Sequence, residues 1–310
     1  MTKLLPFSVR VLITGATGLL GRSLLSAAPK HADTVAISRH ASSALSGQPT
    51  TALNLDVRNM SALSATLATV RPHVIIHAAA EGNVDAVQGN AKDFEDLNVS
   101  VTAFLAQWCR DHSRYLAYVS SNAVFGGRVR PYADDDPPSP INDYGRLKAT
   151  AETAVSSCLP SGLIFRPILM YGWPGPGART NPAAHWVSEL RAGQPIRIVR
   201  DVVTQPLASS DAAKAIWRAV EARSSGSINA SGGVSLSLHE FALLTADTFD
   251  LDKSLITGIE SSELTGIAPR PRCTIFDNKR LNDELRFHPL TPSQGLREMY
   301  QTETSATQGS

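Results

Sequence analysis

The segment YGRLKATAE (residues 144–152) places a tyrosine four residues ahead of a lysine at the start of an alanine-rich helical run. Side chains at positions i and i+4 share one face of a helix, so the Tyr144 phenol and the Lys148 ammonium can point at the same spot. An ammonium beside a phenol favours the phenolate and lowers the pKa of the tyrosine toward the range of an acid–base catalyst. Ordinary helix surfaces also carry this pair, so its meaning depends on its surroundings.

Two further motifs supply those surroundings. Ser120 and Ser121 directly follow the apolar run YLAYV about twenty residues before Tyr144, so a strand there would deliver both hydroxyls to one sheet edge.

The segment TGATGLLGR (14–22) follows another apolar run and has the spacing G-x-x-G-x-x-G, which departs from the usual G-x-G-x-x-G fingerprint. At a strand-to-helix turn, such glycines let a dinucleotide pyrophosphate meet backbone N–H groups and the positive helix end. A tight turn without a ligand is the alternative interpretation. The expected contacts are Gly15, Ala16, Thr17, Gly18, Leu19 and Leu20.

The second apolar run ends in Ser38, Arg39 and His40, without an acidic residue. An acid at this place would bind the adenosine ribose and repel a 2′-phosphate, whereas an arginine would bind that phosphate. The sequence therefore favours NADPH over NADH. The alternative is that Arg39 is only a solvated loop charge that contacts no cofactor, and in that case NADH remains possible. Asp56, with Val57, could contact the adenine, although an aspartate there is also typical of a turn or helix cap.

The segment HAAA (77–80) ends a fourth apolar run with small residues. Ala78, Ala79 and Ala80 would let a cofactor lie against the sheet edge, and a close contact between helix and sheet explains them equally well. We interpret His77 as a packed core histidine.

Alternation of short apolar runs with helical patterns predicts the scaffold that brings these residues together. A Rossmann-type, doubly wound parallel sheet of the α/β class is expected, because helices of this length connect parallel strands. The predicted strands are 9–15, 33–39, 50–56, 73–80, 114–121 and 161–172, and the predicted helices are 18–28, 59–70 and 91–112. We expect residues 1–172 to form the dinucleotide-binding domain, with 201–222 returning to it. A smaller, discontinuous substrate-binding cap would comprise 173–200 and 223–300, and the polar tail 301–310 is expected to be disordered.

Composition excludes several classes. With 29 Lys and Arg against 28 Asp and Glu, the 310-residue chain carries a net charge of +1, so it lacks the basic excess of a general nucleic-acid or membrane-surface binder. No segment offers the roughly 20 apolar residues of a membrane span. Cys109, Cys158 and Cys273 are too dispersed for a metal site and read as reduced thiols, which predicts a cytoplasmic protein without a metal.

Taken together, the chain resembles the extended short-chain dehydrogenase/reductases, and within them the dTDP-4-dehydrorhamnose reductase branch, which also contains the regulatory β subunit of methionine adenosyltransferase. The resemblance rests on segments spread over nearly the whole chain. They are TGATGLLGR, RPHVIIHAAA, VDAV, LNVSVTAFLA, VSSNAVFGG, RPYADDDPPSPINDYGRLKATAE, LIFRPILMYG and APRPRCTIFDNKRL.

The resemblance implies a role for each matched residue. Tyr144 would donate a proton to a ketone, Lys148 would lower its pKa and bind the cofactor ribose, and Ser121 would hold the substrate oxygen. Asn98 matches a helix asparagine near the active site, and Ser38 stands where NADH users often have an acid. The family also implies a homodimer.

The substrate side departs from the branch. Where it typically has STDYVFDG, this chain has SSNAVFGG, and Glu81 replaces an aromatic residue or histidine. The pocket has therefore been rebuilt, and the candidate substrate contacts are Glu81, Asn122, Arg166, Arg179 and Trp186. For Arg166, Arg179 and Trp186, surface charges and a packed tryptophan are the structural alternatives.

The leading hypothesis is an NADPH-dependent reductase of a nucleotide-linked 4-keto-6-deoxysugar. A sugar-nucleotide epimerase or dehydratase is the first alternative, although Asn122 stands where dehydratases usually have an acid. A cofactor-binding regulatory subunit without turnover is the second.

Overall fold

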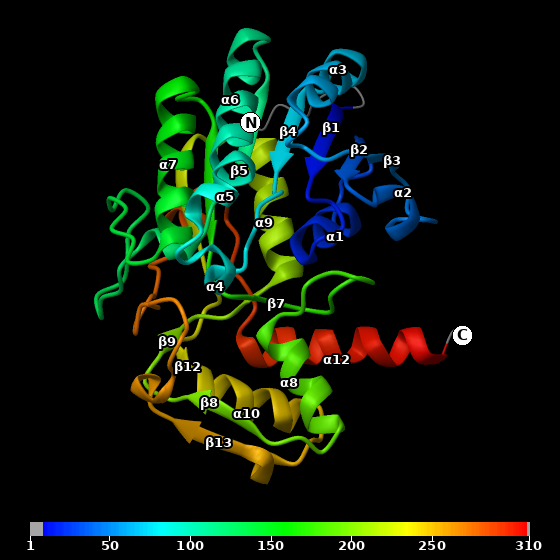
Figure 1. The fold of residues 1–310 in the computed structure, drawn as a ribbon. Coiled ribbons are helices and arrows are strands. Elements are labelled where there is room, and N and C mark those ends of the chain that lie inside the picture. Colours follow the sequence, from blue (N-terminus) through cyan, green and yellow to red (C-terminus); the bar gives the residue numbers. More distant parts are fainter. Residues whose placement is uncertain (1–8, 309–310) are drawn as a thin grey trace.

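The computed structural model describes residues 9–308, and its centre is a seven-stranded, fully parallel sheet with the strand order β11-β6-β5-β4-β1-β2-β3 (Figure 1). This arrangement confirms the predicted doubly wound α/β fold. The strands are β1 (Val9–Thr14), β2 (Ala32–Ser38), β3 (Thr51–Asn54), β4 (Val74–His77), β5 (Tyr115–Val119), β6 (Leu163–Pro167) and β11 (Gly226–Ala230).

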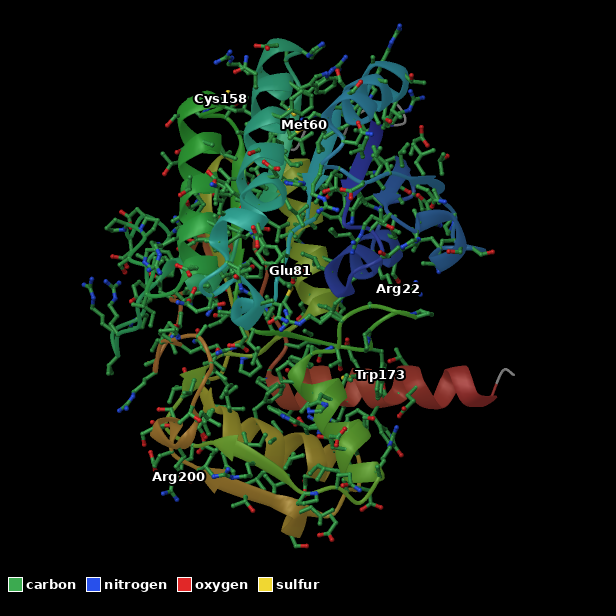
Figure 2. All side chains as sticks on the ribbon, in the orientation of Figure 1. Arg22, Met60, Glu81, Cys158, Trp173 and Arg200 are labelled. Atoms are coloured by element: carbon green, nitrogen blue, oxygen red, sulfur yellow. The ribbon has the colours of Figure 1, made fainter. Side chains whose placement is uncertain are left out.

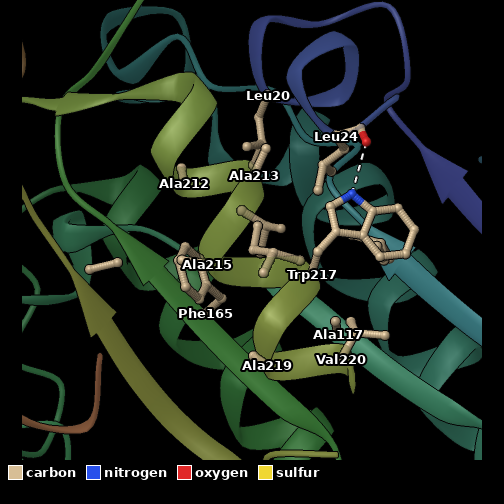
Figure 3. Close-up of a cluster of buried hydrophobic side chains, with 14 of the residues drawn as sticks. Leu20, Leu24, Ala117, Phe165, Ala212, Ala213, Ala215, Trp217, Ala219 and Val220 are labelled. Atoms are coloured by element: carbon tan, nitrogen blue, oxygen red, sulfur yellow. Dashed lines mark hydrogen bonds between the residues drawn. The ribbon is translucent and has the colours of Figure 1, made fainter. Parts of the chain in front are cut away.

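Helices cover both faces of the sheet because its strands are apolar on both sides. One core lies between the sheet and helices α1 (Leu19–Ser26) and α9 (Ser209–Ala222), and the Trp217 Nε1 group donates a hydrogen bond of 2.8 Å to the Leu24 carbonyl within it (Figure 3). The other core lies against α3 (Met60–Val70), α6 (Val101–Asp111) and α7 (Asp143–Cys158). The short helix α2 (Ala41–Ala44) follows β2.

The predicted helix 91–112 is interrupted. It consists of α5 (Ala91–Glu95), a π-helical turn at Asp96–Ser100, and α6. Just before it, the short helix α4 (Val84–Val87) begins with Asn83, whose side chain accepts hydrogen bonds from two backbone N–H groups. π-helical turns often occur at functional sites, and this one carries Asn98.

The second lobe forms the cap below the sheet domain in Figure 1. Its core includes Trp186, Phe241 and Leu296. The elements of the cap and of its junction with the sheet domain are β7 (Met170–Tyr171), α8 (Pro182–Arg191), β8 (Ile196–Val199), β9 (Val203–Thr204), β10 (Leu207–Ala208), β12 (Leu236–Ser237), α10 (Leu238–Thr248), β13 (Ile256–Ile259) and α12 (Pro292–Gln308).

The expected assignment of 223–300 to the cap is wrong in part. Strand β11 pairs with β6 and forms an edge of the main sheet. Phe276, Leu281 and Phe287 then bury their side chains in the sheet-domain core, with α11 (Lys279–Asp283) against β11. The chain therefore returns to the first domain twice after residue 200.

The expected disorder of the tail is also wrong as far as residue 308, because α12 continues to Gln308. Leu296 and Met299 anchor this helix in the cap core, and the Trp173 Nε1 group donates a hydrogen bond of 2.8 Å to the Met299 carbonyl. Arg191 pairs with Glu303 at 2.6 Å. Residues 309–310 lie outside the described part of the chain.

Candidate active site

The glycine turn between β1 and α1 is closed by contacts that only glycine permits. Gly15 has a φ of 68°, and a Cβ there would lie 2.7 Å from the Ala79 backbone nitrogen. A Cβ on Gly21 would lie 2.2 Å from the Gly15 carbonyl oxygen. Gly18 precedes α1 and offers no side chain to cap its first N–H groups. The turn therefore presents free helix N–H groups beside the end of β4, the geometry that suits a pyrophosphate.

The other expected cofactor contacts lie around this turn, but not all offer a side chain. Ala16, Leu20 and Val57 bury their side chains, so only their backbone groups are available to a ligand. Arg39 and His40 are exposed at the end of β2.

Asp56 lies near Arg39 and is held by Arg58, whose Nη2 group is 2.6 Å from its carboxylate. Hydrogen bonding by Arg58, with smaller help from Arg39, lowers the pKa of the Asp56 carboxyl to about 2. Sequence reasoning missed Arg58, because only the fold shows that its guanidinium turns back onto Asp56.

His77 is fully enclosed, with its Nδ1 atom 2.7 Å from the Thr14 hydroxyl and its Nε2 atom 3.1 Å from the Thr102 hydroxyl. Burial, followed by the charge of Lys148, lowers the pKa of His77 to about 3. The ring is therefore neutral and has a structural role, in agreement with the sequence-based interpretation of His77 as a packed core histidine. Ala78, Ala79 and Ala80, which follow it, are partly exposed at the sheet edge.

Tyr144 and Lys148 occupy the first turns of α7, at the carboxyl edge of the sheet. Asn142 caps the helix by accepting a hydrogen bond of 2.8 Å from the Gly145 N–H group. A Cβ on Gly145 would lie 2.1 Å from the Ala123 carbonyl oxygen, so α7 can approach the turn after β5 this closely only with glycine there. This approach brings the Tyr144 phenol near the Ser121 side chain.

The electrostatics of the pair differ from the expectation. Burial raises the pKa of Tyr144, and the nearby Ser121 hydroxyl and the charge of Arg179 only oppose that change. Burial also lowers the pKa of Lys148 to about 7, and its Nζ group donates a hydrogen bond of 2.7 Å to the Val119 carbonyl. The expected lowering of the Tyr144 pKa by Lys148 is therefore wrong for this arrangement, because desolvation dominates both groups.

Comparison with known proteins identifies the family of the chain. A model of the RmlD substrate binding domain matches residues 9–305. The chain belongs to this family. It is 31% identical over 277 residues to a probable dTDP-4,6-dihydroxy-2-methyloxan-3-one 4-ketoreductase of Streptomyces antibioticus, with 88% of each chain covered.

Two further proteins resemble this RmlD-family chain. The methionine adenosyltransferase 2 subunit beta of Bos taurus is 29% identical over 313 residues, which cover 93% of this chain and 86% of the relative. The crystal structure of dTDP-4-dehydrorhamnose reductase from Bacillus anthracis in complex with NADP superposes with a TM-score of 0.86 at 24% identity, covering 96% of this chain and 100% of the other. The predicted membership of the extended short-chain dehydrogenase/reductases is confirmed, which places the chain among NAD(P)-dependent oxidoreductases.

Three residues predicted to contact substrate lie near Tyr144 or Ser121. Glu81 lies where the sheet domain meets the cap (Figure 2), and its backbone N–H group donates a hydrogen bond of 2.9 Å to the buried Asn98 side chain. Arg179 reaches from the loop after β7 and donates a hydrogen bond to the Gly82 carbonyl. The Asn122 side chain accepts a hydrogen bond from the Ser121 hydroxyl at 3.5 Å.

The other two do not face open space, and their assignment to the substrate is wrong. Arg166 is 4% exposed and its guanidinium is occupied by Glu152 and the Asp134 carbonyl. Trp186 is 5% exposed and packs its ring against Phe241 in the cap core. Trp186 is thus the packed tryptophan of the structural alternative, whereas Arg166 is neither a substrate contact nor a surface charge but half of a buried ion pair with Glu152.

A cleft of about 570 Å³ opens between α1 and α12, lined among others by Arg22 and Trp173 (Figure 2). Neither Ser121, Tyr144 nor Lys148 lines it, and Leu19 alone belongs to the expected cofactor contacts. Among residues 9–308, no helix is long and apolar enough to cross a membrane. The same residues contain no group of His, Cys, Asp and Glu that could hold a metal ion.

Proposed function

We propose that the protein is an NADPH-dependent reductase of a nucleotide-linked 4-keto-6-deoxysugar. The observation that carries this proposal is the convergence of Ser121, Tyr144 and Lys148 at the carboxyl edge of the sheet, next to a glycine turn shaped for a pyrophosphate. The similarity to a probable 4-ketoreductase supports the same reaction.

The residues present fit a dinucleotide. The turn is packed so closely that only glycine fits at Gly15, and Gly18 leaves the first N–H groups of α1 without a side-chain cap. Ala78, Ala79 and Ala80 have small side chains, so the adjoining sheet edge carries no bulky group that would block a cofactor. When bound, the cofactor would supply the hydride. Tyr144 would donate its phenolic proton to the carbonyl oxygen, and the Ser121 hydroxyl would hold that oxygen by a hydrogen bond. Burial keeps Tyr144 protonated before the reaction, as a proton donor requires.

Arg39→Ala should weaken NADPH binding by about tenfold or more, because one charge-assisted hydrogen bond to the 2′-phosphate is lost. NADH binding should change little, because that cofactor lacks the phosphate. Titration of nicotinamide fluorescence measures both affinities, and Arg71→Ala, a change at an exposed arginine after α3, is the matched control. Equal losses for the two cofactors would remove the proposed preference.

The rebuilt pocket predicts a changed substrate. Glu81, Asn122 and Ala123 replace the side chains that the rhamnose-pathway branch presents next to Ser121. We expect kcat/KM for dTDP-4-dehydrorhamnose to be at least about tenfold below that of the best sugar in a panel of nucleotide-linked keto-sugars. If dTDP-4-dehydrorhamnose proves the best substrate, the departures do not determine specificity.

A regulatory role is the second candidate, because the methionine adenosyltransferase 2 subunit beta matches 93% of this chain. Such a subunit would bind the cofactor and a partner enzyme without turnover. Co-purification with a synthetase, together with failure to oxidise NADPH with every keto-sugar of the panel, would favour this role over the reductase.

A further inference from the structure

Three buried side chains with ionisable groups lie at and next to the catalytic pair Tyr144 and Lys148. Lys148, Glu152 and Arg166 are 2%, 3% and 4% exposed, so water screens none of them appreciably. Charged groups this deep are costly unless each has a partner. Glu152 and Arg166 satisfy each other, but their depth beside the reacting residues calls for a further explanation.

Glu152 lies on the catalytic face of α7, because positions 144, 148 and 152 are separated by four residues each and are all buried. Its carboxylate is held at both oxygens by Arg166 of β6, with Nε–Oε1 and Nη2–Oε2 distances of 2.9 and 2.7 Å. Arg166 is itself fixed, because its Nη1 group donates to the Asp134 carbonyl at 3.2 Å and its guanidinium lies over the Phe125 ring. Arg166 therefore fixes the carboxylate of Glu152, which lies one helical turn after Lys148.

The groups around Lys148 come from four elements. His77 of β4 is neutral, and the Tyr118 ring of β5 lies 4.5 Å from the Lys148 Nζ atom. Tyr144 lies one turn before Lys148 on α7 and Glu152 one turn after it, and Arg166 of β6 stands behind Glu152. Of these, Glu152 favours the ammonium, and it opposes the burial that lowers the pKa of Lys148 to about 7.

We propose that Glu152, fixed by Arg166, is a positioning residue that keeps Lys148 charged at the reaction site. The contribution to turnover rests on the proposed reductase function, whereas the effect on the charge of Lys148 does not. The arrangement gives the buried ion pair a purpose beyond packing, since an apolar pair would fill the same space at no electrostatic cost.

The test follows the Lys148 ammonium directly, by NMR titration of the side-chain Cε resonance in ¹³C-lysine-labelled protein without cofactor. The resonance is assigned by its loss in Lys148→Met. We expect Glu152→Gln to move the titration midpoint down by about one pH unit or more, because removal of the carboxylate favours the neutral amine. Glu263→Gln, which breaks the surface pair with Arg197, is the matched control and should leave the midpoint unchanged.

Glu152→Gln leaves Arg166 buried without a counter-charge, and this single variant could fail to fold for that reason. The double variant Glu152→Gln with Arg166→Met removes both charges and is measured in its place in that case. Its midpoint should lie below that of the parent protein, but by less than in Glu152→Gln, because the Arg166 charge removed with the carboxylate opposes it. An unchanged midpoint in either folded variant would overturn the proposal.

Turnover separates this proposal from the function it rests on. In Glu152→Gln, the alkaline limb of the kcat/KM profile for NADPH-dependent reduction should move to lower pH with the NMR midpoint. If the midpoint moves and the limb does not, the electrostatic effect of Glu152 holds and the catalytic role of Lys148 fails. If neither moves, the role of Glu152 fails while the reductase activity itself stands.

Discussion

Replacing Tyr144 by phenylalanine is expected to lower kcat for carbonyl reduction by about 10³-fold, the usual contribution of a general acid. The phenol is the buried hydroxyl that contacts Ser121, and its pKa is raised, so it holds its proton until a carbonyl oxygen accepts it. Phenylalanine preserves the ring and its packing with Ala123 and Leu147. The affinity for NADPH should therefore stay within a few-fold of the parent value, which fluorescence titration measures.

Tyr300→Phe is the matched control for this experiment, because Tyr300 lies on α12 of the cap, 39% exposed and packed edge-on against Phe249. The same hydroxyl is removed there without a change at the site, and kcat should not change. Retained turnover in Tyr144→Phe would show that another group supplies the proton.

Gly21→Ala is expected to cost about 3 kcal/mol or more in the free energy of unfolding, measured by denaturant titration without cofactor. The added Cβ would lie 2.2 Å from the Gly15 carbonyl oxygen and 2.6 Å from the Ala16 Cα atom. Both contacts are backbone atoms, so no side chain can rotate away. The first turn of α1 must shift, and NADPH binding should be lost with it.

Gly18→Ala tests whether the geometry of the turn, rather than glycine content, explains this cost. A Cβ at Gly18 would meet only the Gly15 carbonyl oxygen at 3.3 Å, which a shift of a few tenths of an ångström relieves. We expect a stability loss of less than about 1 kcal/mol. Equal losses in the two variants would contradict the packing described for Gly21.

The sheet domain could be predicted because its signals are local. Each strand of the first 172 residues is a short apolar run, and each helix pattern follows a turn residue such as Gly18 or Asn59. The cap could not be divided correctly, because β11 joins the main sheet through pairing with β6, more than fifty residues earlier. Phe276 and Phe287 belong to that domain because their side chains pack in its core. The hydrophobic periodicity of a segment predicts its own secondary structure but not which distant strand it pairs with.

The candidate site also has a part that the sequence predicts and a part that it does not. The order of the motifs predicted Ser121, Tyr144 and Lys148, whose contact depends on the local spacing of α7 and the turn before it. Arg166 was misassigned because its burial depends on Glu152, and the sign of the Tyr144 pKa change depends on desolvation. Both are properties of the folded environment, which residue types and spacing do not contain.

Transfer of deuterium tests the central claim most directly. The parent protein is incubated with NADPH deuterated at the transferable position and a panel of nucleotide-linked 4-keto-6-deoxysugars, and the products are examined by NMR. A reductase will deliver one deuterium to C4 of at least one sugar, and Tyr144→Phe will deliver almost none. If NADPH binds but no sugar in the panel acquires deuterium, the protein is not the proposed reductase.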